Sequence, residues 1–212
     1  MRVFQKMSHN KHRDVRNVFL VSLAIWTFWC VLMIWQPVPF ANDIVRAFVR
    51  VGCVLLPALW FSQRHAEPFE LWPIKWGEVG AGVIASVLLL GAILLVDRPN
   101  AFILPTGFAT YFNFILGSPI VEELLFRGVI FRQLARRYPF WQALIGSSAL
   151  FVVFHWPWWL LSGDVAGMAF LSSSVSIFVL GLIFAALLKR TGSLWPPVIF
   201  HILNNLVALG IT

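Results

Sequence analysis

Apolar runs about as long as a bilayer is thick recur along the chain, and they constrain its fold more than any other feature. A membrane-spanning helix needs roughly 20 apolar residues, and the 212-residue sequence offers seven such runs. They lie at 18–36, 45–62, 79–96, 107–131, 140–161, 168–188 and 194–211. Hydrophobic residues make up 59% of the chain and charged residues only 12%, which is too apolar for a soluble domain. The sequence therefore predicts an all-α, polytopic transmembrane helix bundle.

The run at 107–131 is irregular in two ways. Gly117, Ser118 and Pro119 lie in its middle, and residues of these types predict a kink or break in a helix. A further short or re-entrant element between 99 and 117 would raise the number of spans from seven to eight. We therefore expect seven to eight spans.

Basic side chains indicate the orientation of these spans and the division of the chain. The net charge is +7 at pH 7, but the lysines and arginines lie between apolar runs and form no aromatic-interleaved patch that would bind nucleic acid. Placing the N-terminus in the cytoplasm leaves only Arg46, Arg50 and Arg98 outside, in agreement with the excess of Lys and Arg in cytoplasmic loops. We expect a basic cytoplasmic tail at 1–17 and one transmembrane domain at 18–212.

Two adjacent carboxylates stand out inside the fourth run. Glu122 and Glu123 follow an apolar stretch, and Arg127 comes four residues after the second. Ionisable groups at membrane depth are costly and usually mark function. On a helix, Glu123 and Arg127 lie one turn apart and can pair, whereas Glu122 points about 100° away from Glu123. The pattern predicts that Arg127 neutralises Glu123 and that Glu122 is available for chemistry.

Three more polar groups occur inside later runs. His155 lies in the fifth, and His201 and Asn205 lie four residues apart in the last, so they share one helix face. Singly, each has a structural explanation, such as an interfacial residue or a hydrogen bond between helices. Together with Glu122 they are harder to explain structurally, because several buried polar groups would carry desolvation penalties without function. We therefore predict that Glu122, His155, His201 and Asn205 converge on one pocket.

These four side chains suit amide hydrolysis within the membrane. A buried carboxylate can act as a general base toward water, and an imidazole can share that water or protonate the leaving amine. A His–Asn pair can donate hydrogen bonds to a developing oxyanion. No Gly-x-Ser-x-Gly elbow is present, so direct attack by water is favoured, with no cofactor. An alternative is a zinc enzyme in which Glu122, His155 and His201 are the ligands.

Three patterns in this chain resemble the signature motifs of the CPBP intramembrane proteases. They are Glu122-Glu123-x-x-x-Arg127, Phe151-x-x-x-His155 and His201-x-x-x-Asn205. This family, also called Abi, includes type II CAAX prenyl endopeptidases and bacteriocin-processing or self-immunity proteins. The resemblance covers a catalytic core at about 105–212.

The resemblance implies a role for each matching residue. Glu122 and His155 would activate the water, and His201 and Asn205 would form the oxyanion hole. Two further residues, Glu123 and Arg127, would hold the site in shape. The mechanism would then be glutamate-dependent rather than metal-dependent.

The expected partners are the lipid bilayer and a membrane-associated peptide or protein substrate, not nucleic acid. By resemblance, that substrate is a C-terminal CAAX-like tail, a sorting segment or a bacteriocin-type peptide, cut in the bacterial cytoplasmic (inner) membrane. Two other classes of function use the same residues. One is a non-catalytic immunity or scaffold protein, and the other is a proton-coupled transporter with Glu122 and the histidines as a relay.

Overall fold

The computed structural model describes the C-terminal two thirds of the chain almost completely and the N-terminal third in part. The described residues are 19–28, 30–31, 34, 45, 48–49, 51–52, 54–56, 59–60, 76–97, 103–163 and 165–210. Their regular structure is helical throughout, without strands, so the all-α prediction is confirmed. The predicted tail at 1–17 lies outside the described residues, as does much of the first two predicted spans.

Four long helices and one composite helix make up the described C-terminal part. The long helices are α3 (Trp76–Asp97), α7 (Phe140–Ser162), α8 (Gly167–Thr191) and α9 (Trp195–Gly210). The composite helix, called the motif helix below, runs over residues 108–135 and carries Glu122, Glu123 and Arg127. It consists of α4 (Phe108–Thr110), η2 (Tyr111–Gly117), α5 (Ser118–Glu123), η3 (Leu124–Phe131) and α6 (Arg132–Ala135).

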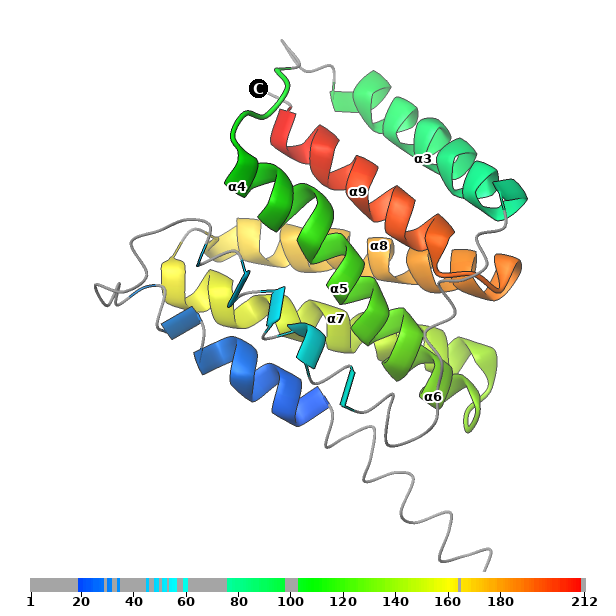
Figure 1. Cartoon of the computed structure of the whole chain (residues 1–212), viewed down its shortest axis with the longest axis horizontal. Coiled ribbons are helices and arrows are strands. Elements are labelled where there is room, and N and C mark those ends of the chain that lie inside the picture. Colours follow the sequence, from blue (N-terminus) through cyan, green and yellow to red (C-terminus); the bar gives the residue numbers. More distant parts are fainter. Residues whose placement is uncertain are drawn as a thin grey trace, which may run out of the picture.

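The helices α7 and α8 form an antiparallel hairpin (Figure 1). Gly163 ends α7 with φ 72°, and Gly192 ends α8 with φ 75°. Each donates its backbone N–H to the carbonyl of the residue four positions earlier, which is the left-handed helix end that glycine favours. These two helices are long and apolar enough to cross a membrane, whereas the apolar stretches Phe19–Phe28 and Val79–Ala92 are shorter. The number of seven to eight spans stays a prediction.

The motif helix crosses the α7–α8 hairpin, and α9 and then α3 lie beside it (Figure 1). α3 and α9 touch at both ends: a Cβ on Gly82 would lie 2.6 Å from Cα of Pro196, and the Ile103 N–H, shortly after α3, donates to the Gly210 carbonyl at 2.8 Å. Only a glycine leaves room for the first contact. α3 therefore supports α9 along its length.

The irregularity predicted at Gly117, Ser118 and Pro119 takes the form of π-helical turns rather than an interruption. Gly117 and Ser118 keep right-handed helical backbone angles. The Ser118 N–H reaches back five residues, to the carbonyl of Asn113. Pro119 has no N–H to continue this ladder. Two π-helical segments, η2 and η3, flank the short α5, and such turns often occur at functional sites.

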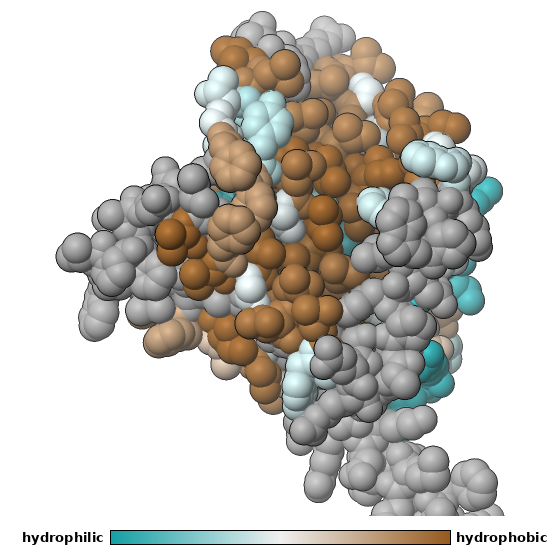
Figure 2. Space-filling model, viewed as in Figure 1, coloured by the Kyte–Doolittle hydropathy of each residue, from teal (hydrophilic) through white to brown (hydrophobic). Residues whose placement is uncertain are grey.

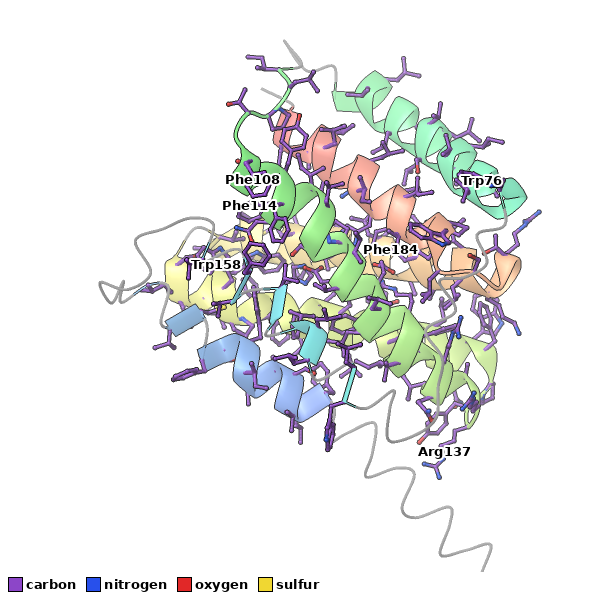
Figure 3. All side chains as sticks on the ribbon, viewed as in Figure 1. Trp76, Phe108, Phe114, Arg137, Trp158 and Phe184 are labelled. Atoms are coloured by element: carbon purple, nitrogen blue, oxygen red, sulfur yellow. The ribbon has the colours of Figure 1, made fainter. Side chains whose placement is uncertain are left out.

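The motif helix is the buried centre of the bundle. Every residue from 121 to 131 is buried, including the three charged residues of the motif. Phe126 packs edge-on against Phe151 and Phe154 of α7, with ring centroids 4.9 and 5.3 Å apart. Phe184 of α8, labelled in Figure 3, is fully buried in the same core.

The outer surface, in contrast, carries many large apolar side chains. Leu88, Leu95, Leu160 and Met168 are each more than 65% exposed, and the described residues on the face drawn in Figure 2 are predominantly hydrophobic. Proteins that fold in water rarely expose contiguous apolar surface of this extent. This distribution is typical of a protein that contacts lipid.

Candidate active site

The two adjacent glutamates at the end of α5 face different partners. Glu123 is fully buried, and its Oε2 lies 3.2 Å from Nε of Arg127 one turn later. Glu122 is 8% exposed, and its Oε1 accepts a hydrogen bond from the Ser118 hydroxyl at 2.7 Å. The predicted pairing of Glu123 with Arg127 is present. Glu122 instead faces the histidines of α7 and α9.

Arg127 joins the motif helix to α7 and α8. Its Nη2 donates to the Gly181 carbonyl of α8 at 3.2 Å. Its guanidinium carbon lies 4.3 Å from the ring centroid of Phe151 and 4.9 Å from that of Phe184. A desolvated cation is attracted to aromatic faces, and a buried charge needs a paired anion. The rings and Glu123 together hold the cation in place.

His201 of α9 contacts both glutamates. Its Nδ1 lies 3.0 Å from Oε1 of Glu123, so Glu123 bridges Arg127 and His201. Its Nε2 lies 4.0 Å from Oε2 of Glu122. The imidazole stacks on Phe184 with ring centroids 4.8 Å apart. When Nδ1 donates its hydrogen to Glu123, the neutral ring presents the Nε2 lone pair toward Glu122.

His155 of α7 approaches Glu122 from another helix. Its Nδ1 is 2.8 Å from the Phe151 carbonyl, which can only accept, so Nδ1 carries the hydrogen. Its Nε2 then faces Oε2 of Glu122 at 4.0 Å. At 4.0 Å neither imidazole bonds to the carboxylate directly. Each imidazole nitrogen thus lies at a distance from Oε2 of Glu122 that one bridging water could span.

Asn205 lies one turn after His201 on α9, about 6 Å along the helix axis. Its Nδ2 donates to the Phe114 carbonyl in η2 at 2.8 Å. In the π-helical ladder the N–H of residue 119 would bind this carbonyl, but residue 119 is proline. The Asn205 amide supplies the missing donor. An amide nitrogen has two N–H groups, so one remains for another acceptor.

The structure thus brings together Glu122, His155 and His201, with Asn205 one turn away. Sequence reasoning missed Ser118 and the second partner of Glu123. The spacing of four between Ser118 and Glu122 was a readable signal. No local signal exists for the contact between Glu123 and His201, which are 78 residues apart.

The zinc alternative gains no support from the donor arrangement. Among the described residues, no group of three or more His, Cys, Asp or Glu side chains is placed to hold a metal ion. The 4.0 Å separations from Glu122 Oε2 to the two imidazoles are also wider than the roughly 3.4 Å that tetrahedral zinc with bonds near 2.1 Å gives.

Comparison with known proteins adds an independent observation. A family model described as type II CAAX prenyl endopeptidase Rce1-like matches residues 104–207. No curated protein matches the chain. The matched region contains the whole motif helix, α7, α8 and all four candidate catalytic residues. It agrees with the resemblance to the CPBP proteases. The Rce1-like family consists of membrane-embedded proteases, and the lipid-like surface agrees with that setting.

The chain is therefore an integral membrane protein that carries an Rce1-like (type II CAAX prenyl endopeptidase) domain at residues 104–207.

Proposed function

We propose that this protein is a glutamate-type intramembrane endopeptidase that cleaves a peptide bond with water. One observation carries the proposal: Oε2 of Glu122 lies 4.0 Å from Nε2 of His155 and 4.0 Å from Nε2 of His201. Three polar atoms from three helices thus approach one another inside the bundle. Such a site holds a water molecule next to a base and excludes bulk solvent.

The reaction begins with the carboxylate of Glu122 accepting a proton from the water, with His155 as the second acceptor that orients it. The oxygen attacks the carbonyl carbon of the scissile amide, and the carbonyl oxygen becomes an oxyanion. The proton then passes to the amide nitrogen, the C–N bond breaks, and a carboxylic acid and an amine leave, the acid giving up its proton to the amine. Direct attack by water needs no acyl-enzyme.

His201 and Asn205 stabilise the oxyanion in this mechanism. Nδ1 of His201 already donates to Glu123, so donation from Nε2 requires a doubly protonated ring. Glu123 at 3.0 Å balances that positive charge. Asn205 contributes through its second amide N–H. Each donor to an oxyanion typically contributes about 3 kcal/mol.

The proposed substrate is a membrane-associated peptide or protein, with a C-terminal CAAX-like tail as the first choice because of the family. A sorting segment or a bacteriocin-type peptide would use the same chemistry. The proposed setting is a bacterial cytoplasmic membrane, crossed by seven to eight spans with the N-terminus in the cytoplasm. The abundance of exposed apolar side chains supports this setting.

Glu122→Gln tests the proposal, because the amide keeps the shape of the side chain but cannot accept a proton. Membrane peptides from cells with wild type and variant are compared by mass spectrometry. We expect at least one new terminus that depends on Glu122. Ser147→Ala, which removes a buried hydroxyl bonded to Leu144 on α7, is the matched control and should give the wild-type pattern. Identical peptides from wild type and Glu122→Gln would refute proteolysis.

The metal-free mechanism predicts that proteolysis survives chelation. Protein purified without metal and treated with EDTA should cut its substrate at the untreated rate, because no step uses a Lewis acid. Loss of cleavage that returns on addition of Zn²⁺, but not Mg²⁺, would instead assign Glu122, His155 and His201 as zinc ligands.

A further inference from the structure

Ser118 is the first residue of α5, and its side chain is buried beside the site. Its hydroxyl donates to Oε1 of Glu122 at 2.7 Å. That length is typical of a hydrogen bond from a hydroxyl to a carboxylate, which is stronger than one between neutral groups. The oxygen that Ser118 holds is not the one that faces the histidines.

This division between the two carboxylate oxygens has a consequence for Glu122. The terminal torsion of a glutamate is broad and roughly two-fold, so a carboxylate without a fixed partner can rotate. With Oε1 bonded to Ser118, Oε2 is the oxygen that lies 4.0 Å from Nε2 of both histidines. The hydroxyl therefore sets which lone pairs face the space between the imidazoles.

The direction of the Ser118 hydroxyl is itself explained by the fold. Serine in a helix commonly bonds to the carbonyl four residues earlier, as Ser86 does with Gly82 and Ser148 with Leu144. For Ser118 that carbonyl belongs to Phe114, which accepts the amide of Asn205 instead. Ser118 bonds forward to Glu122.

We propose that Ser118 is a positioning residue for proteolysis, which fixes the carboxylate of Glu122 so that Oε2 faces His155 and His201. This inference rests on the proposed function, because it assigns the base of that reaction a partner. Ser118 acts through Glu122 and does not touch the substrate.

The test measures cleavage of a fluorogenic peptide with a farnesylated CAAX tail by the purified full-length protein in proteoliposomes. For Ser118→Ala we expect kcat to fall about 10- to 100-fold, which corresponds to the loss of a hydrogen bond to a charged group. KM should change little, because the substrate does not contact Ser118.

Two further variants separate positioning from a structural role. Ser118→Thr keeps the hydroxyl and should restore kcat. Ser118→Cys keeps the volume but has only a weak donor, so kcat should stay near that of Ser118→Ala while the Tm stays near wild type. Ser147→Ala is again the control and should retain wild-type kcat.

The outcomes distinguish this inference from the proposed function. If Glu122→Gln abolishes cleavage while Ser118→Ala and Ser118→Cys keep wild-type kcat, the positioning role is wrong and the proteolytic function stands. A covalent adduct of the peptide with Ser118 would also overturn it, because Ser118 would then be a nucleophile. If Ser118→Cys and Ser147→Ala both lower the Tm and lose kcat to the same extent, the loss of activity comes from disturbed packing and not from the orientation of Glu122.

Discussion

At the scale of single residues, Glu123 has the most demanding surroundings in the site. Its carboxylate lies 3.2 Å from Arg127 and 3.0 Å from His201, and it is fully buried. One anion thus compensates a buried cation and fixes the ring that faces Glu122. Stability and orientation of the site depend on the same side chain.

Glu123→Gln separates these two roles. We expect it to destabilise the protein by roughly 3–5 kcal/mol, because the guanidinium of Arg127 would remain buried without its anion. Chemical unfolding in detergent measures this loss. The double variant Glu123→Gln with Arg127→Met should recover much of the stability, since it removes the buried cation that the single variant leaves without its anion.

Cleavage should not recover in that double variant, because the neutral amide at position 123 can still accept from Nδ1 of His201 but no longer balances a positive charge on the ring. Full recovery of both stability and cleavage would show that Glu123 serves only to compensate Arg127. Unchanged stability in Glu123→Gln alone would contradict the ion pair as a source of stability.

At the scale of elements, the π-helical segment η2 links α5 to α9. Pro119 leaves the Phe114 carbonyl without its ladder donor, and Asn205 of α9 takes that place at 2.8 Å. A break in the local hydrogen-bond pattern of one helix thus becomes an attachment point for another. This contact orients the side-chain amide of Asn205, which is the proposed hydrogen-bond donor to the oxyanion.

Pro119→Ala restores a backbone N–H that competes for the Phe114 carbonyl. We expect kcat to fall roughly tenfold, as for the loss of one hydrogen bond, with equal or greater helix stability. In an Asn205→Ala background the same change should have little further effect on kcat, because the two substitutions act through one contact. Fully additive losses would show that Pro119 acts elsewhere.

What the sequence predicted about these elements follows from the range of each interaction. The helical nature of the chain and the pairing of Glu123 with Arg127 are local, and both were predicted. The π-helical segments η2 and η3 were not predicted. The spacing of apolar residues does not show whether a backbone N–H binds the carbonyl four or five residues earlier. Contacts such as Arg127 with Gly181 join distant parts of the chain and leave no trace in local spacing.

At the scale of the whole molecule, the described residues place a small charged group at the centre of the bundle and many large apolar side chains on the outside. The buried stretch 121–131 carries both glutamates and the arginine, whereas α3 and α8 expose leucine, valine and methionine. Composition alone predicted this membrane setting. Which polar residues meet was predicted only from the co-occurrence of three motifs, whose catalytic roles stay a prediction.

Glu122, His155 and His201 lie on three helices that follow one another along the sequence, and α9 is the last of them. A ribosome therefore delivers the base and one imidazole well before the second imidazole. Until α9 packs against α3 and the motif helix, the nascent chain holds an incomplete hydrolase. The order of the helices thus delays completion of the proposed site until α9 has been synthesised.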